Sequence, residues 1–346
     1  MSRTDFSVVI PIYNKRPHIR RAVDSVFRQS CQEFELILID DASTDGSMDE
    51  LKSIEDPRVV RARRETPGPG GYAARNLGVK MARGDWIAFL DADDEWNERI
   101  LEEFLEMRES FPDARILCTG FVYKKGSREV VNDFTSRRTD RGEKEPGRVG
   151  LKVYLRETRM GRCPVHTSCV CMRKDLLEEI GGFPEDRCRR GGDRDTWLRA
   201  ADRSDIIWSP YIGELYYCDS VNMVTKTVPE GEGCSLQTLD GMIGKYAENG
   251  DPGRLLPELR KLKQQLIEIR IKKIAKDGHL GWKDLEGFSF RMEPIKYTLY
   301  RLLALLPGQL IGLLLKGFLT LKNGGTASNT AGSAEAVPGP GADKDR

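Results

Sequence analysis

The stretch that most constrains the fold is a short apolar run that ends in three carboxylates. Trp86 to Leu90 is apolar throughout, and Asp91-Ala92-Asp93-Asp94 follows it at once. Such a run is typical of a strand that is buried on both faces of a covered parallel sheet. Because side chains alternate along a strand, Asp91 and Asp93 are predicted to project to one side. The alternative is that Asp94 is the N-cap of an amphipathic helix expected over residues 97–111.

The order of the apolar runs predicts an α/β domain. Strands are expected at residues 6–10, 34–39, 58–62, 86–90 and 167–172, and helices at 18–28, around 73–78, and at 97–111, 174–180 and from 190 onward. The early strands end in polar loops with helices behind them. This alternation indicates a mostly parallel central sheet flanked by helices, whose ligands bind beyond the carboxyl ends of the strands.

Composition excludes several classes of protein. With 346 residues, the chain is long enough for one large domain with appendages or for two domains. The formal net charge of +1 gives no whole-molecule field that would attract nucleic acid. No secretory signal is visible at the start, and the eight cysteines form no recognisable framework, so we expect a cytoplasmic protein. Three histidines argue against a histidine-rich metal centre or a Ser-His-Asp triad.

Three later segments fall outside the alternation. Residues 124–150 are charged and poor in large apolar residues, which favours a flexible insertion or an irregular hairpin. Residues 255–276 are expected to form a long amphipathic helix. Residues 297–321 hold two apolar blocks separated by Pro307-Gly308, and the uncharged run is shorter than the ~20 residues that span a bilayer. Basic residues flank these blocks: Lys296, Arg301, Lys316 and Lys322. We expect residues 297–321 to touch a membrane surface, peripherally on its inner face; the alternative is a helical hairpin packed on protein.

The loop after the first strand points to a metal ion. Pro11-Ile12-Tyr13-Asn14 stands where a nucleotide-binding domain usually has a glycine-rich phosphate cradle. Phosphate charge would therefore have to be met mainly by a metal ion. Mg²⁺ and Mn²⁺ prefer oxygen ligands and usually take only one or two carboxylates from the protein, as Asp91 and Asp93 could provide.

The loops after the second and third strands can recognise a nucleoside. Asp41 can accept hydrogen bonds from a base or a ribose, Arg75 can donate to a pyrimidine carbonyl, and Tyr13 can stack on the base. The alternative for Asp40, Asp41 and Asp45 is an Asx-turn or a helix cap.

Five motifs together resemble glycosyltransferase family 2, the inverting enzymes with a GT-A fold. They are Val9-Ile10-Pro11-Ile12-Tyr13-Asn14, Ile39-Asp40-Asp41-Ala42-Ser43-Thr44-Asp45, Ala74-Arg75-Asn76, Phe89-Leu90-Asp91-Ala92-Asp93-Asp94, and Gly181-Gly182-Phe183 followed by Asp193 and Trp197-Leu198-Arg199. They stand in the family's order over residues 5–225. The resemblance implies a catalytic domain at 1–225, with a nucleotide-binding half at about 1–120 and an acceptor half at about 121–225. A helical extension would follow at 226–322 and a disordered tail at 323–346.

The resemblance also implies the substrates and the nucleotide site. The donor would be a nucleotide sugar, usually a UDP-sugar, and the acceptor a hydroxyl of a growing glycan, a polysaccharide or a lipid-linked saccharide. Asp41, with Pro11, Tyr13 and Asn14, would border the nucleotide. Arg75 would contact the base.

In the same resemblance the acids after the fourth strand and in the later helix carry the reaction. Asp93 would ligate Mn²⁺ or Mg²⁺, and Asp91 would contact ribose or metal-bound water. Asp193 would be the catalytic base and Asp195 the next candidate. The alternative for Asp193 is a helix N-cap.

Two departures from the family bear on activity. Many relatives have a Glu-Asp pair where this chain has Gly192-Asp193, and many have a His in the segment that is here Tyr217 to Asn222. A nucleotide-sugar-binding scaffold without strong activity is therefore a second hypothesis. Nucleotidyl transfer is a third, although Pro11 to Asn14 lacks the glycine-rich basic loop that it would need.

Overall fold

The computed structural model describes residues 5–223, 234–251, 253–307 and 310–311. These residues form two compact units that divide between Gly241 and Met242. The first unit holds every strand of the described residues. The strands are β1 (Phe6–Ile12), β2 (Phe34–Asp40), β3 (Val59–Arg63), β4 (Trp86–Phe89), β5 (Glu95–Trp96), β6 (Ile116–Lys125), β7 (Arg128–Val131), β8 (Gly147–Val149), β9 (Val170–Arg173) and β10 (Ile206–Tyr217).

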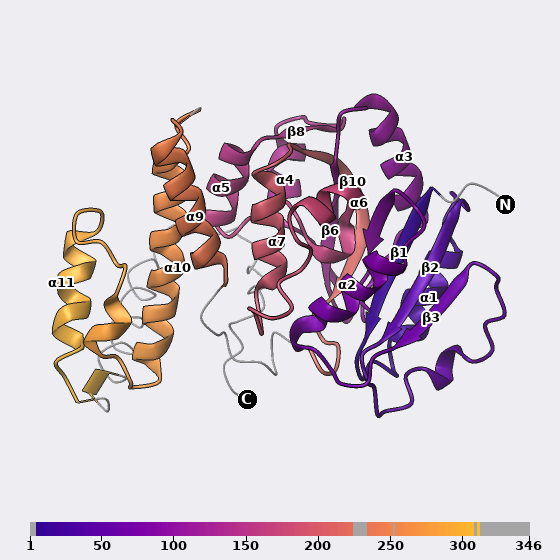
Figure 1. Ribbon diagram of the computed structural model, residues 1–346, viewed down its shortest axis with the longest axis horizontal. Helices are drawn as coiled ribbons and strands as arrows, with labels where there is room; N and C mark the ends of the chain where they lie inside the picture. Colours follow the sequence, from indigo (N-terminus) through magenta and orange to yellow (C-terminus); the bar gives the residue numbers. More distant parts are fainter. Residues whose placement is uncertain (1–4, 224–233, 252, 308–309, 312–346) are drawn as a thin grey trace. The chain divides into compact units, whose positions relative to one another are not determined.

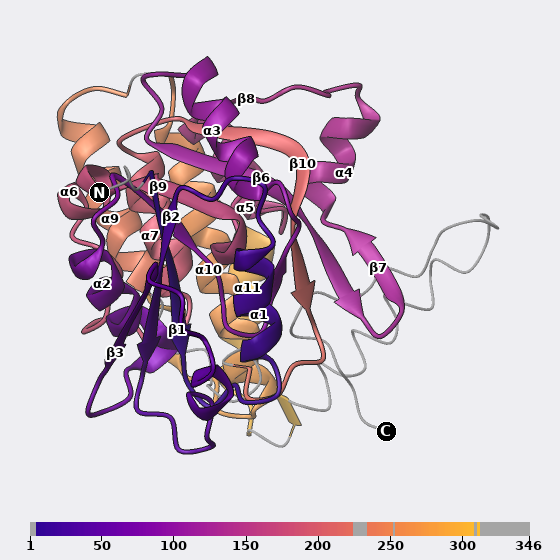
Figure 2. The same ribbon diagram turned by 90° about the vertical axis from the view of Figure 1, so that its right-hand side faces the viewer.

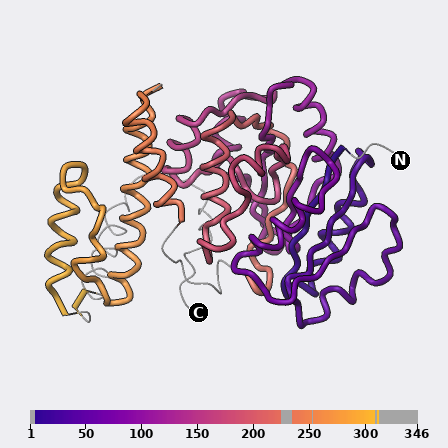
Figure 3. The backbone as a smooth tube through the Cα atoms, in the orientation of Figure 1, coloured from indigo at the N-terminus to yellow at the C-terminus, as the bar shows by residue number. Residues whose placement is uncertain are grey.

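The first half of the sheet is parallel throughout. Its order is β3-β2-β1-β4, and the chain passes between these strands through α1 (Ile19–Phe27) and α2 (Tyr72–Met81) (Figure 1, Figure 3). In the register, Phe6 faces Phe34 on one side and Trp86 on the other. The carboxyl ends of these strands therefore lie at one edge of the sheet, as the alternation predicts.

The second half of the sheet is joined through an antiparallel strand. β9 lies between β4 and β6 and runs antiparallel to both, while β6 and β10 are parallel. β5 and β8 add to β10, and β7 forms a hairpin with β6. The strand predicted over residues 167–172 begins later, because Thr167–Cys169 forms a 3-10 turn.

Helices cover both faces of the sheet because its apolar residues alternate between the two (Figure 2). Val8 and Ile10 pack with α1 and with α3 (Ile100–Ser110). Val9 faces α2 on the opposite side, where the strand approaches Gly78. The remaining helices of the described residues are α4 (Asp133–Asp140), α5 (Leu151–Arg159), α6 (Lys174–Glu179), α7 (Gly192–Ala201), α9 (Cys234–Glu248), α10 (Leu256–Lys276) and α11 (Pro294–Leu303).

The charged segment at 124–150 is more regular than a flexible insertion. It contains the β7 hairpin, α4 and β8. One aromatic contact explains the helix: Phe134 is buried and meets the ring of Trp208 edge to face, with centroids 5.2 Å apart. A single buried ring compensates for the low apolar content of the segment.

The second unit is helical. The predicted helix at 255–276 is confirmed as α10. The Tyr300 hydroxyl of α11 donates to Glu268 of α10 at 3.4 Å, and its ring meets that of Phe288, in the segment between the two helices, with centroids 5.6 Å apart. Lys296 of α11 also pairs with Glu268 of α10 at 3.0 Å. No helix among the described residues is both long and apolar enough to cross a membrane. The apolar segment predicted at 297–321 is described only in part, and the predicted tail at 323–346 lies outside the described residues.

Candidate active site

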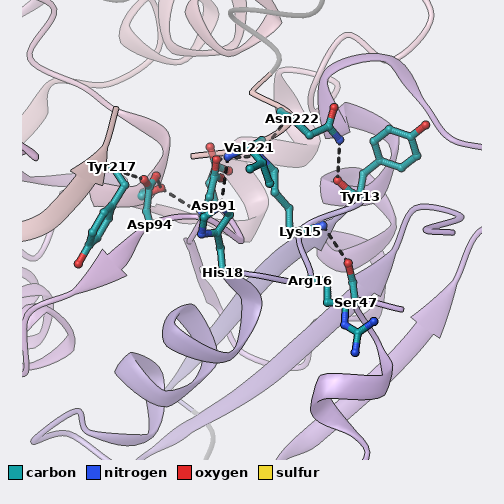
Figure 4. Close-up of polar contacts among 12 residues, drawn as sticks. Tyr13, Lys15, Arg16, His18, Ser47, Asp91, Asp94, Tyr217, Val221 and Asn222 are labelled. Carbon is teal, nitrogen blue, oxygen red and sulfur yellow. Dashed lines mark hydrogen bonds and ion pairs between the residues drawn. The ribbon is translucent and has the colours of Figure 1, made fainter. Parts of the chain in front are cut away.

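Hydrogen bonds join the loops after β1 and β2 at the carboxyl edge of the sheet (Figure 4). The backbone N–H of Asn14 donates to Ser43 Oγ at 3.1 Å, and Asn14 Oδ1 accepts from the N–H of Thr44 at 2.8 Å. The N–H of Lys15 donates to Ser47 Oγ at 2.8 Å. Asn14 adopts a left-handed backbone with φ of 52°. The predicted nucleotide loop is therefore held by side-chain hydrogen bonds rather than by glycines.

Each carboxylate predicted to contact the nucleotide or the metal ion forms an ion pair with an arginine or a lysine. The pairs are Asp41 with Arg64, Asp91 with Arg75, and Asp93 with Lys15. The Asp41 side chain is 1% exposed, and its Oδ2 also accepts from the N–H of Gly68 at 3.0 Å. The Lys15–Asp93 pair measures 2.7 Å from Nζ to Oδ2. This edge of the sheet therefore carries both positive side chains, which attract a diphosphate, and carboxylates, which attract a metal ion.

The neighbouring acids Asp40 and Asp45 have the structural role that was the alternative in the sequence. Asp40 Oδ1 accepts from the N–H of Ser43 at 2.8 Å. Asp45 accepts from the backbone N–H groups of Arg16 and Ser47, each at 2.9 Å. Both acids fasten loops. Asp40 also pairs with Arg63, the last residue of β3, at 2.9 Å.

Arg75 lies between the site and the core. Its side chain is buried, its Nη1 donates to the carbonyl of Gly70 at 2.9 Å, and its Nη2 donates to Asp91. Burial opposes the charge of both partners, but their attraction lowers the pKa of Asp91 and raises that of Arg75. The pair is therefore ionised. To contact a nucleobase as predicted, Arg75 would have to use N–H groups other than those that donate to Gly70 and Asp91.

Residues 91–94 form a turn rather than the continuation of a strand. β4 ends at Phe89, and the N–H of Asp94 donates to the carbonyl of Asp91 at 3.1 Å. Strand alternation therefore does not fix the directions of Asp91 and Asp93, because the chain turns within residues 91–94. Asp91 and Asp93 instead meet different cationic partners, Arg75 from α2 and Lys15 from the loop after β1.

Asp94 does not cap the following helix. α3 begins at Ile100 with Arg99 as its N-cap residue, and no side chain caps it. Asp94 is buried and accepts from Ser168 Oγ at 2.7 Å and from the N–H of Tyr217 at 3.2 Å. Burial, then the charge of Glu214, raises the pKa of Asp94 well above its usual range. This acid therefore joins three segments of the chain beneath the site.

The partly buried His166 pairs with the buried Glu214 next to Asp94. His166 Nδ1 is 2.7 Å from Glu214 Oε1, and Glu214 is fully buried. Burial alone would lower the pKa of His166, but Glu214 raises it to about 10. Each of the three residues offers one ligand atom within 4.8 Å of the others, so they form a possible metal-binding triad. The short His166–Glu214 contact also suits a protonated imidazole.

The oxygens around Asp93 fit a divalent cation. Asp93 Oδ2 and the carbonyl oxygens of Val221 and Asn222 converge on one point, where they bind Lys15 Nζ at 2.7, 2.9 and 3.1 Å (Figure 4). Carboxylate and carbonyl oxygens are the donors that Mg²⁺ and Mn²⁺ prefer. Two of the three oxygens are backbone carbonyls of the segment after β10.

Asp193 lies in the first turn of α7. The N-cap residue of this helix is Gly191, with φ of 80°, so Asp193 does not cap it. Among the described residues, no hydrogen bond or ion pair engages the Asp193 carboxylate. Asp195 is different: it is fully buried and accepts from Arg199 Nε at 2.9 Å and from Thr238 Oγ1. Of the two acids, Asp195 is held by Arg199 and Thr238, whereas Asp193 has no such partner among the described residues.

Tyr72 explains why glycine precedes Asp193. A Cβ atom at Gly192 would lie 2.7 Å from Tyr72 Cζ and 2.8 Å from Pro184 Cγ. The N–H of Gly192 donates to the Tyr72 hydroxyl at 2.8 Å. Burial, then the charge of Asp193, raises the pKa of Tyr72 to about 12. The space beside position 192 is therefore filled by Pro184 and by the neutral Tyr72 side chain.

Two further links position the loop before Asp193. Asn76 holds Phe183 by two backbone hydrogen bonds, from Nδ2 at 2.9 Å and to Oδ1 at 2.8 Å. A disulfide joins Cys188 to Cys234, the first residue of α9. The sequence showed no cysteine framework, because these two cysteines are 46 residues apart and are brought together only by the fold.

The mostly parallel sheet flanked by helices, with acids beyond β2 and β4, has the architecture of a GT-A fold. The family model for glycosyl transferase family 2 matches residues 7–181. The chain belongs to this family, and the resemblance seen in the motifs is confirmed.

Solved structures confirm the predicted fold. TarS 1–349 of S. aureus, crystallised in complex with UDP-GlcNAc, has a TM-score of 0.69 and 17% sequence identity, covering 92% of both chains. Curated relatives agree with the family. An uncharacterized glycosyltransferase of Rickettsia felis is 31% identical over 59% of this chain, and the amylovoran biosynthesis glycosyltransferase AmsB of Erwinia amylovora is 37% identical over 32%. The matches span 31% and 37% of the lengths of these two relatives.

Proposed function

We propose that this chain is an inverting glycosyltransferase that moves a sugar from a nucleoside-diphosphate donor, a UDP-sugar, to a hydroxyl acceptor. One observation carries the proposal. At one edge of the sheet, three carboxylates form ion pairs with Arg or Lys side chains: Asp41, Asp91 and Asp93. The Asp193 carboxylate has no hydrogen-bonding partner among the described residues. A donor site with paired charges and a separate unpaired carboxylate are the two parts that this reaction requires.

The nucleotide is proposed to lie on the loops after β1 and β2. Asp41 would accept hydrogen bonds from the base or the ribose, with Pro11 and Asn14 beside it. The Tyr13 side chain is 40% exposed, which leaves a ring face open for stacking on a base. Arg75 would contact the base. A UDP-GlcNAc complex of the structurally similar TarS supports the choice of a nucleotide sugar.

In the proposed reaction, Asp193 accepts the proton of the acceptor hydroxyl. The hydroxyl oxygen forms a bond to the anomeric carbon while the bond to the diphosphate breaks, and the electron pair of that bond leaves with the diphosphate. Inversion requires in-line attack, so the base belongs on the face opposite the leaving group. A divalent cation held by Asp93, with Asp91 beside it, would stabilise the charge of the departing diphosphate.

A screen of nucleotide sugars with Mn²⁺ tests the proposal. We expect hydrolysis or transfer of one donor, and we expect Asp93→Ala or a chelator to lower turnover by at least about 10²-fold, since the site has few protein ligands. Asp49→Ala is the control, because it removes an exposed carboxylate that pairs with Lys52. Wild-type turnover in Asp93→Ala, or no effect of the chelator, would show that the metal site is assigned wrongly.

The same screen separates the alternative functions. The absent acid at Gly192 and the absent histidine in residues 217–222 favour a scaffold as the second candidate. A scaffold would bind UDP with Mn²⁺ in calorimetry but would turn over no donor in a broad panel. A nucleotidyltransferase would release pyrophosphate from a nucleoside triphosphate. The acceptor is proposed to be a glycan, a polysaccharide or a lipid-linked saccharide, a proposal in keeping with a relative named for amylovoran biosynthesis.

We also propose a cytoplasmic protein that touches the inner face of the membrane through residues 297–321. Exposed apolar side chains on and after α11 support this proposal: Ile295, Leu299, Leu302, Leu305 and Leu310. The two described basic residues have other partners. Lys296 pairs with Glu268, and the Arg301 guanidinium lies 3.6 Å from the ring centroid of Trp282. The proposed contact would therefore depend mainly on apolar burial.

A further inference from the structure

The Lys15 side chain has the surroundings of a bound cation. Its ammonium group has three N–H donors, and it meets three acceptors: Asp93 Oδ2 at 2.7 Å, the carbonyl of Val221 at 2.9 Å and the carbonyl of Asn222 at 3.1 Å (Figure 4). The exposed fractions of the Lys15 and Asp93 side chains are only 12% and 14%. The ammonium is thus saturated and largely withdrawn from water.

These contacts join the loop after β1 to the turn after β4 and to the segment after β10. Two further bonds join the first and the last of these segments. His18 Nε2 accepts from the N–H of Val221 at 3.1 Å, and Asn222 Nδ2 donates to the carbonyl of Tyr13 at 3.2 Å. Lys15 therefore lies at the centre of a small closed network rather than on an open surface.

We propose that Lys15 is a built-in competitor of the divalent cation at Asp93. The ammonium occupies the position of the ion when no ion is bound, and an entering ion must displace it from the three oxygens. This inference rests on the proposed metal site at Asp93. It adds that Lys15 lowers the metal affinity of the free protein and that an entering ion expels the Lys15 ammonium from the three oxygens.

The competition follows from charge and geometry. An ammonium and a divalent cation cannot share the same three oxygens at contact distance, because both would lie at the same point and repel each other. Charge-assisted hydrogen bonds to a withdrawn carboxylate favour the ammonium-bound state. The apparent affinity for the ion equals its intrinsic affinity multiplied by the fraction of molecules in which Lys15 has left the site. Removal of the ammonium should therefore raise the affinity for Mn²⁺ by roughly 10- to 100-fold.

The test measures Mn²⁺ binding to the full chain without any nucleotide, by electron paramagnetic resonance of the free ion. Lys15→Met removes the charge and keeps most of the side-chain length, and Lys15→Gln is the second variant. Lys52→Met is the matched control, since it removes one positive charge from a pair with Asp49 whose members are 77% and 59% exposed. We expect tighter binding in both Lys15 variants and wild-type binding in the control.

The outcomes separate this inference from the proposed function. If Mn²⁺ binds with equal affinity to the wild type and to both Lys15 variants, and Asp93→Ala abolishes binding in each, the competitor role is wrong and the metal site stands. If no protein binds Mn²⁺, or if binding is insensitive to Asp93→Ala, the metal site and the competitor role both fail. Thermal melting of each variant identifies any that does not fold, and the remaining Lys15 variant then decides.

Discussion

The Tyr72 ring fills the space that a side chain at position 192 would occupy, beside the proposed general base Asp193. The Tyr72 ring cannot swing away, because it is buried and stacks on Phe183 with centroids 6.3 Å apart. Any side chain at position 192 would therefore meet a fixed ring. Packing therefore excludes a larger side chain at position 192, and the Tyr72 hydroxyl accepts a hydrogen bond from the Gly192 N–H at 2.8 Å.

The first prediction concerns this pair of residues. Gly192→Glu should destabilise the protein by about 1–3 kcal/mol through overpacking. A new acid in the first turn of α7 would return only ~0.3–1 kcal/mol through the helix dipole. Tyr72→Ser alone should also destabilise, because it leaves a cavity. In the double variant the two costs should not add, and the coupling measured by urea unfolding should exceed about 1 kcal/mol. Strictly additive costs would contradict the shared volume.

At the scale of elements, the close approach of α2 to β1 positions Arg75 at the site. Gly78 makes this approach possible: a Cβ there would lie 2.4 Å from Val9 Cγ1. Arg75 lies one turn earlier on the same helix and reaches Asp91. Glycine lowers the helix propensity at position 78, but it lets α2 pack closely against β1.

The second prediction tests that packing. Gly78→Ala should destabilise by about 1–2 kcal/mol, since overpacking outweighs the gain of ~1 kcal/mol in helix propensity. In a Val9→Ala background the contact is relieved, so the same change should become neutral or stabilising. Chemical denaturation of the four proteins measures both effects. A stabilising Gly78→Ala in the wild-type background would refute the close approach.

The sequence predicts the elements far better than the links between them. β1, β2 and β4 were predictable to within two residues because each is a local apolar run. The turn at 91–94 and helix α4 were not, since one depends on where the chain bends and the other on a contact between Phe134 and Trp208. Lys15–Asp93 and His166–Glu214 join residues that are 78 and 48 positions apart. No local pattern marks such pairs, so only the fold reveals them.

At the scale of the whole molecule, the described part of the C-terminal segment has an apolar face. Ile295 is 84% exposed and Leu302 is 59% exposed. These residues stand seven positions apart on α11, which places them on one side of the helix. Such a face suits contact with a membrane surface or with another protein.

The third prediction is that the full chain floats with anionic liposomes, whereas a chain truncated before Glu293 remains at the bottom of the gradient. Replacing the exposed Ile295 and Leu302 with serine in the full chain should weaken flotation, because apolar burial drives the contact. A full chain that behaves like the truncated one would favour the alternative, a helical hairpin packed on protein.

The central claim is that Asp193 is the general base, and one substitution tests it most directly. Asp193→Asn keeps the shape of the side chain and removes its capacity to accept a proton. We expect this variant to transfer sugar roughly 10²- to 10⁴-fold more slowly, with thermal unfolding and UDP affinity close to wild type. Asp195→Asn is the matched control: it should instead cost stability, because Asp195 is fully buried and pairs with Arg199. An Asp193→Asn protein that transfers sugar at the wild-type rate would contradict the account.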